Sequence, residues 1–238
     1  MKNNYRIFII LVVTILYNVN VIFRYQEPAL SFIFKGAYAG IDYMGEMIWF
    51  FLFISVSFYF VGNIEDRFYG FGIYEMVRGA KRSIILLKCY AVAGLQLLFI
   101  TIGQIAITII LSKIVKVDIF KEDFSTFILY FAMYFFTVYT LILIQLFLEL
   151  YVKPQIAMLA LNIYVVFSIS LAGVLYKYKE LNSVLYGLIP NFAMSLRTSV
   201  INKDIFAINY KIAAVFLGFI LLCIVISSIK RIQRKDIY

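Results

Sequence analysis

The chain lacks histidine entirely, and it has only two cysteines and three prolines among its 238 residues. Without an imidazole, most zinc hydrolases, His-activated nucleophiles and histidine proton relays are excluded. Cys89 and Cys223 both lie in apolar runs, so we expect two reduced thiols. The sequence therefore predicts neither a disulfide nor a metal site.

Charged residues are also scarce. Only 15% of the residues are charged, whereas 64% are hydrophobic. A soluble domain of this size could not bury so much apolar surface in one core, so the surrounding solvent must be lipid. The net charge of +9 fits basic residues that flank membrane spans. We therefore expect a bilayer-embedded protein that does not bind nucleic acid.

Sequence motifs for catalysis and for nucleotide binding are missing as well. There is no Walker A loop and no G-x-S-x-G nucleophile motif, so we expect neither ATP bound by this chain nor hydrolase activity. No acidic residue is predicted near the middle of the membrane, which argues against a carrier driven by protons or sodium. We therefore expect that the chain is not an enzyme and binds no cofactor. We also expect that another protein supplies the energy for its function.

What the chain does contain is long apolar runs. A membrane-spanning helix needs about 20 apolar residues. Six segments qualify, and we expect one all-α membrane domain over residues 1–238 with spans at 7–23, 44–62, 83–112, 124–150, 155–176 and 210–229. The N-terminal segment begins with basic residues, as a signal peptide does. No small-residue cleavage site follows it, so we expect it to be retained as the first span.

The distribution of Lys and Arg predicts the orientation. An even number of spans places both termini on one side, and the clearest basic clusters are Lys2 and Arg6 at one terminus and Lys230, Arg231 and Arg234 at the other. By the positive-inside rule both termini are predicted to be cytoplasmic. Residues 63–82 then face the cytoplasm, and the long loop over 177–209 faces outward.

The segment 63–82 combines charge with an unusually apolar composition for a loop. It contains Phe68, Tyr69, Phe71, Ile73, Tyr74, Met76 and Val77. One interpretation is a solvated basic loop that only fixes the topology. The other is a docking surface on a short amphipathic helix, which Gly70 and Gly72 break or bend. Because basic residues lead directly into the third span, this surface is well placed to transmit force.

The same segment resembles the coupling helix of small six-span type-2 permeases of ATP-binding-cassette (ABC) exporters. That family has an acidic residue, a Gly about four positions later, an Arg about a dozen further on and a Lys at the start of span three. Asp66, Gly70, Arg82 and Lys88 stand at close to these intervals. Where the family often has Thr after the Gly and Pro before the Arg, this chain has Phe71 and Gly79.

The resemblance implies a partner arrangement and a role for each residue of the segment. This chain would pair with a second permease as a homo- or heterodimer, above two cytoplasmic ABC ATPase subunits that bind ATP and Mg. The apolar face of Tyr69, Ile73, Tyr74 and Met76 would insert into the ATPase. Asp66, Glu75 and Arg78 would frame that contact, and Arg82 and Lys88 would anchor span three.

The resemblance also implies a location and a cargo. The location is the cytoplasmic membrane of a bacterium, and the cargo of such permeases is an amphipathic or antimicrobial peptide or a lipid-like molecule. Short helices that dip into the outer leaflet are expected from the apolar stretch 181–194, which is too short to span. An ordinary structured loop is the alternative there.

Polar and aromatic residues within the spans are the candidates for a translocation path. Gln96 and Gln104 lie in the third span, and Tyr134 and Tyr139 lie in the aromatic fourth span. Such residues more often pack or bond between helices than contact a substrate. Two other functions stay open: a substrate-capturing subunit of a vitamin-uptake ABC transporter, and a stand-alone immunity protein that sequesters a toxin without ATP.

Overall fold

The computed structural model describes residues 2–25, 34, 36–38, 43–69, 71–79, 81–116, 123–176, 178, 182–200 and 207–234. Helices dominate this part of the chain, and one isolated β-bridge joins Thr198 to Ile208. The long helices are α1 (Lys2–Tyr25), α3 (Tyr43–Phe60), α6 (Arg82–Val115), α7 (Phe124–Glu149), α8 (Pro154–Leu175) and α10 (Tyr210–Arg234). The short ones are α4 (Asn63–Tyr69), α5 (Phe71–Val77), α9 (Asn182–Leu185), η2 (Ile189–Ala193) and η3 (Ser195–Arg197).

Five helical segments are long and apolar enough to cross a membrane. They are Tyr43–Phe68, which joins α3 to α4, together with Arg82–Val115, Phe124–Glu149, Pro154–Leu175 and Tyr210–Gln233. The prediction of an all-helical chain with several membrane-spanning helices is confirmed to this extent. Within α1 the apolar helix is shorter, Tyr5–Asn20, so a sixth span stays a prediction.

The exposed faces of these helices carry apolar side chains, as expected for helices surrounded by lipid. On α6 one stripe of side chains is buried, whereas Leu95, Phe99 and Ile110 on its other faces are 57%, 72% and 58% exposed. A soluble protein rarely presents such contiguous apolar area to water. The helices are apolar on both their buried and their exposed faces, as expected where the surrounding solvent is a bilayer.

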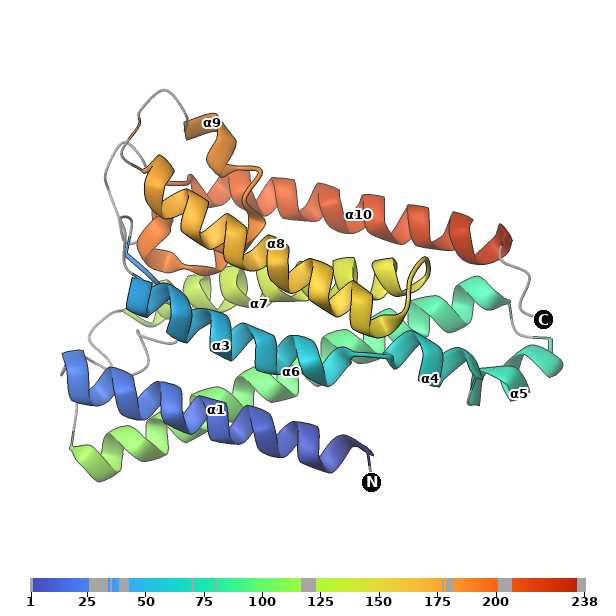
Figure 1. Ribbon diagram of the computed structural model, residues 1–238, viewed down its shortest axis with the longest axis horizontal. Helices are drawn as coiled ribbons and strands as arrows, with labels where there is room; N and C mark the ends of the chain where they lie inside the picture. The colour runs from blue at the N-terminus through green and yellow to red at the C-terminus, as the bar shows by residue number, and fades with distance from the viewer. Residues whose placement is uncertain are drawn as a thin grey trace.

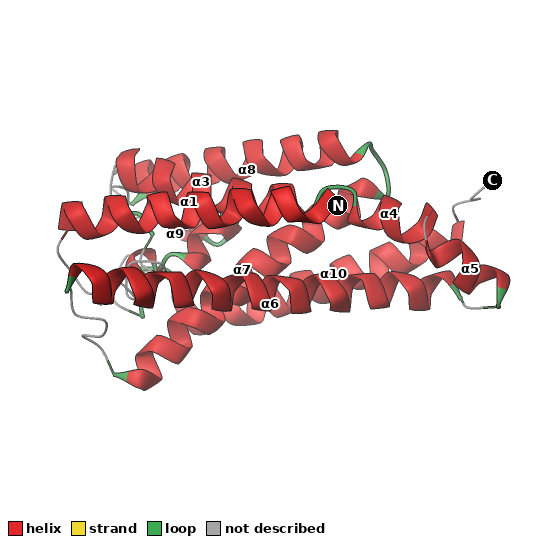
Figure 2. Ribbon diagram, turned by 90° about the horizontal axis from the view of Figure 1, so that it is seen from below, coloured by secondary structure: helices red, strands yellow, loops and turns green. Residues whose placement is uncertain are grey.

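The long helices form one elongated bundle with two distinct ends (Figure 1). The start of α1, the α3–α4 junction, the α7–α8 turn and the end of α10 lie toward one end, here called the proximal end. The opposite, distal end holds the start of α3, the end of α6 and the α9–η2–η3 segment. Helix α6 crosses α1 obliquely in Figure 1, and Figure 2 shows α7 running obliquely to α1 and α8.

Helix α7 is the centre of the bundle. It packs against α3, α6, α8, α10 and η2. Its buried side chains include Tyr134, Leu141 and Leu146. The five residues of η2 are also buried, and they pack on α7 and α8. Most of the apolar stretch predicted at 181–194 therefore folds into short helices, of which η2 is packed into the bundle.

Most polar side chains of the long helices find partners inside the bundle. Ser57 donates to Gln145 Oε1 at 2.7 Å, and Asn162 donates to Ser57 Oγ at 3.2 Å, which links α3, α7 and α8. Thr108 donates to Asn18 Oδ1 at 2.9 Å and links α6 to α1. Hydrogen bonds between helices thus engage Asn18, Ser57, Gln145 and Asn162, which is the usual role of polar side chains in membrane helices.

Lys153 lies four positions after Glu149, a spacing that would favour an ion pair on one helix. Helix α7 ends at Glu149, and α8 starts anew at Pro154, so the four-residue spacing does not lie on one helix. Glu149 Oε1 instead accepts a hydrogen bond from the backbone N–H of Gly62 at 3.1 Å. Glu149 thereby connects α7 to the turn between α3 and α4.

Candidate functional site

Residues 63–79, here called the α4–α5 element, lie at the proximal end, and α5 reaches slightly beyond the start of α6 and the end of α10 (Figure 1). A turn on each side sets the element off from the long helices. Gly62 precedes α4 with φ +78°, and Gly79 follows α5 with φ +86°. Glycine adopts this left-handed region without the steric penalty that other residues meet. The two glycines therefore allow the chain to leave α3 and to return into α6.

Within the element the two short helices pack closely. Ile64 and Phe68 of α4 are 6% and 3% exposed. A Cβ atom on Gly72 of α5 would lie 2.3 Å from the backbone oxygen of Arg67. No side chain fits there unless α5 moves away from α4. Gly72 thus permits a close approach of the two helices, a role that its place in the sequence did not reveal.

One carboxylate connects α5 to both neighbouring helices. Glu75 Oε1 pairs with Arg67 Nη2 of α4 at 3.0 Å, and Glu75 Oε2 pairs with Lys88 Nζ of α6 at 3.3 Å. Partly exposed ion pairs contribute only about 0–1 kcal/mol each. Their main effect is therefore to orient α5 relative to α4 and α6. Glu75, expected to frame a partner contact, has both oxygens engaged within the chain.

The outer side of α5 is exposed. Tyr74 is 68% and Val77 is 82% exposed, and Arg78 follows them on the surface. Met76, expected to insert into a partner, is partly buried and packs against the core. Tyr74 and Val77 are therefore the apolar side chains best placed to meet a partner.

The remaining residues of the predicted coupling segment lie around this surface. Asp66 is exposed on α4, and Arg82 is the first residue of α6. Tyr69 ends α4 and Ile73 lies within α5, but their side chains, like the whole of Gly70, lie outside the described residues.

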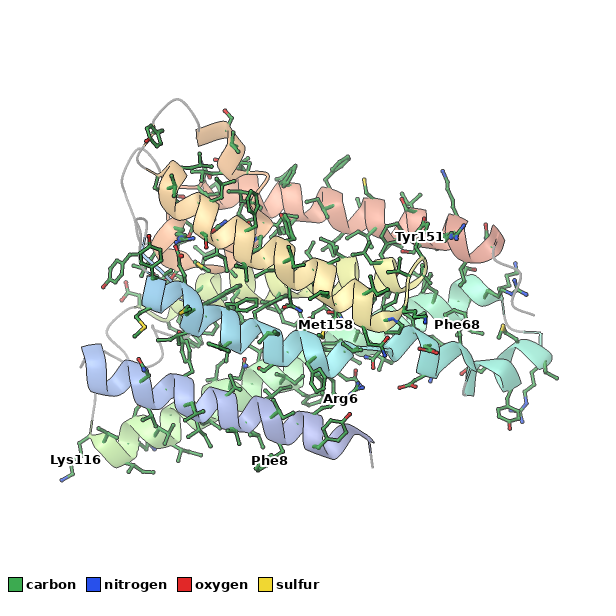
Figure 3. All side chains as sticks on the ribbon, viewed as in Figure 1. Arg6, Phe8, Phe68, Lys116, Tyr151 and Met158 are labelled. Atoms are coloured by element: carbon green, nitrogen blue, oxygen red, sulfur yellow. The ribbon has the colours of Figure 1, made fainter. Side chains whose placement is uncertain are left out.

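The proximal end also fixes α1 and the α7–α8 turn close to α4. Figure 3 shows Arg6, Phe68 and Tyr151 toward this end and Lys116 at the opposite one. Arg6 Nη1 donates to the carbonyl oxygens of Tyr59, near the end of α3, and of Val61, in the turn that follows, at 3.0 and 2.9 Å. A cavity of about 260 Å³ lies between α4, the α7–α8 turn and α10.

Two of the four residues proposed for a translocation path come together. Gln96 and Gln104 line a groove of about 350 Å³ between α1, α3 and α6, here called the α1–α6 groove. The other two lie elsewhere on α7. The Tyr134 ring packs on Phe34 with centroids 5.3 Å apart, and the Tyr139 hydroxyl donates to the Tyr90 carbonyl at 3.1 Å. Both tyrosines thus have packing or bonding roles in the core.

The distal end contains a buried ion pair that the sequence did not predict. Arg197 is fully buried, and its Nη2 pairs with Glu46 Oε1 at 2.8 Å. Its other nitrogens donate to Asn191 Oδ1 and to the carbonyls of Ile169 and Tyr38 at 2.6, 2.9 and 3.1 Å. This Arg197 cluster joins η3 to α3, α8 and η2. Glu46 and Arg197 lie 151 positions apart, so no local spacing could reveal the pair.

Comparisons with known proteins place the chain in a family. A family model described as "Protein of unknown function (DUF2705)" matches residues 7–238. The uncharacterized protein YybK of Bacillus subtilis (strain 168) is 32% identical over 200 residues, which cover 82% of this chain and 80% of YybK. No solved structure matches the chain. With nearly its whole length matched by the family model, the chain belongs to the DUF2705 family.

Proposed function

We propose that this chain is the permease subunit of an ABC exporter. The observation that carries the proposal is the α4–α5 element, which lies at the proximal end and is connected by Glu75 to both α4 and α6. An ATPase works in water, so it needs a contact outside the bilayer that is joined to a membrane-spanning helix. In the proposed orientation the α4–α5 element meets both requirements, and its exposed Tyr74 and Val77 would be available for docking.

The orientation that we propose for the chain follows from the basic residues at the proximal end of the bundle. The element lies at the same end as the start of α1 and the end of α10. Basic residues gather there, including Arg6, Arg78, Lys81 and Lys230. The positive-inside rule then places the proximal end in the cytoplasm and the distal end outside the cytoplasmic membrane of a bacterium.

Single-cysteine labelling in intact cells tests this orientation. We expect an impermeant maleimide to label Tyr178→Cys and not Lys81→Cys, both in a chain whose Cys89 and Cys223 are replaced by Ala. Tyr178 is exposed at the distal end and Lys81 is exposed beside the α4–α5 element. Permeabilised cells are the control, in which both positions should react. Labelling of Lys81→Cys alone in intact cells would show that the orientation is the reverse of the one proposed.

The proposed assembly contains a second permease, identical or different, and two ATPase subunits that hold ATP and Mg. Its cargo is an amphipathic or antimicrobial peptide or a lipid-like molecule. The two alternatives differ in their partners. A vitamin-capturing subunit would also bind an ATPase module but would take up a small molecule from outside. A stand-alone immunity protein would bind a toxin with no ATPase.

Copurification from the native host tests the ATPase contact. We expect the wild-type chain, solubilised gently, to retain a protein with Walker A and ABC signature motifs, identified by mass spectrometry. Exposed aromatic anchors of interfaces often contribute about 1–2 kcal/mol or more, so Tyr74→Ala should reduce the recovered ATPase by about fivefold or more.

The matched control is Tyr43→Ala at the distal end, where the Tyr43 side chain is 71% exposed, much like the 68% of Tyr74. This variant should retain ATPase like the wild type. The absence of any ABC ATPase from intact complexes would favour the immunity protein. Equal recovery with Tyr74→Ala and Tyr43→Ala would leave the α4–α5 element without a docking role.

A further inference from the structure

The α1–α6 groove opens on an exposed, apolar side of the bundle. Helices α1 and α6 form its walls, and Tyr59 of α3 contributes to its lining. Phe99 at its edge is 72% exposed, and Ile7 and Leu11 on the α1 side are 42% and 40% exposed. At about 350 Å³ the groove is within the size range of small-ligand sites. A molecule that approaches this apolar side therefore reaches the groove without crossing the protein.

Two glutamine amides in this groove have polar atoms without partners. Gln104 is 2% exposed, and neither its Nε2 nor its Oε1 has a hydrogen-bond partner among the described residues. The buried Oε1 of Gln96 is likewise unpaired within the described chain. Leaving such groups unsatisfied is costly, and native proteins rarely do so. By contrast, Thr14 in the same groove donates to the Ile10 carbonyl and is satisfied.

Gly103 keeps the groove open beside Gln104. A Cβ atom at Gly103 would meet no other atom within 4 Å. A larger residue would occupy this space without clashing with the protein. The absence of a side chain at this position therefore leaves room for a ligand beside an unpaired amide.

The chemistry of an amide limits what can fill the groove. The Gln104 amide must both donate and accept a hydrogen bond. Phospholipid acyl chains do neither, and their esters only accept. A single water molecule needs two to four polar partners. The two glutamines are eight residues apart on α6, about 12 Å along the helix, so one water cannot bond to both. A residue of an extended peptide presents its N–H and its C=O on the same side, so it can donate to Gln104 Oε1 and accept from Gln104 Nε2.

We propose that the α1–α6 groove binds a short apolar peptide segment in an extended conformation, with its backbone amides bonded to Gln104 and Gln96. An extended chain rises about 3.3 Å per residue, so a span of about 12 Å corresponds to about four residues. The identification of this peptide as cargo rests on the proposed export function. Peptide binding itself needs no ATPase, so it is tested separately from coupling.

The test uses the purified full chain in lipid nanodiscs without any ATPase. The probe is an acetylated tetraleucine amide that carries a photo-crosslinking group, and binding is measured by saturable crosslinking. Its control is the same peptide with N-methylated backbone amides, which cannot donate. We expect the unmethylated peptide to bind at least about tenfold more tightly, as the loss of a buried hydrogen bond or two would predict.

Two variants locate the binding. Gly103→Leu should abolish saturable crosslinking because its side chain fills the groove, whereas Gly218→Leu on α10, also in open space, should bind like the wild type. Gln104→Leu should remove the preference for the unmethylated peptide. Equal binding of both peptides by the wild-type chain, or binding unchanged in Gly103→Leu, would overturn the proposal. A third outcome would also overturn it. If Gly103→Leu weakened the self-association of the chain and left peptide binding unchanged, the groove would be a contact between two copies of the chain.

Discussion

Replacing Arg197 by Met is expected to lower the free energy of unfolding by about 3–5 kcal/mol, the usual cost of removing one partner from a buried ion pair. The reason is that Glu46, itself only 6% exposed, would keep a buried charge without its partner. The hydrogen bonds to Asn191, Ile169 and Tyr38 would be lost at the same time. The measurement is the unfolding free energy in mixed micelles titrated with SDS.

Arg78→Met, on the exposed surface after α5, is the matched control and should change that free energy by less than about 1 kcal/mol. The double variant Arg197→Met with Glu46→Gln should recover part of the loss, because no charge is then left unpaired. If Arg197→Met unfolds like the wild type, the Arg197 cluster does not stabilise the distal end.

Gly72→Ala is expected to disconnect the α4–α5 element while leaving the bundle folded. The new Cβ atom would lie 2.3 Å from the backbone oxygen of Arg67, so α5 must move away from α4. That movement separates Glu75 from Arg67 and shifts Tyr74. We expect the recovered ATPase to fall at least about tenfold, equivalent to about 1.4 kcal/mol, and amide hydrogen exchange over residues 71–77 to accelerate.

The same substitution at Gly218, where a Cβ atom meets nothing within 4 Å, provides the control. Gly218→Ala should preserve both ATPase recovery and hydrogen exchange, since alanine is the better helix former. Unchanged exchange in Gly72→Ala would show that the close approach of α4 and α5 is unimportant. Accelerated exchange with undiminished ATPase recovery would separate the element's packing from any docking role.

Much of the helical architecture follows directly from the sequence because lipid imposes a simple rule. A run of about 20 apolar residues has to satisfy its backbone hydrogen bonds internally, so it becomes a helix. Pro154 stands directly before the predicted span 155–176, and it is the first residue of α8, where proline is well tolerated. Helix α4 ends at Tyr69 and α5 begins at Phe71, and the expected bend at Gly70 itself lies outside the described residues.

Which side of each helix packs into the bundle could not be predicted in the same way. A span that is apolar on every side gives no periodic signal for which side packs inward. The aromatic fourth span makes Tyr134 and Tyr139 candidates for a path, whereas in the structure both pack or bond in the core. The ion pair between Glu46 and Arg197 could not be predicted either, because only the tertiary fold brings the start of α3 close to η3.

Helix α6 has 34 residues and is about 51 Å long, whereas the hydrocarbon core of a bilayer is about 30 Å thick. Its buried stripe extends from Ile85 to Ser112, so the helix cannot shorten without losing core contacts. It must tilt, or extend past the headgroups, and the local bilayer must adjust around it. Hydrophobic mismatch therefore acts on the same helix that begins at the α4–α5 element, and a change in lipid chain length would alter the angle at which that element is presented.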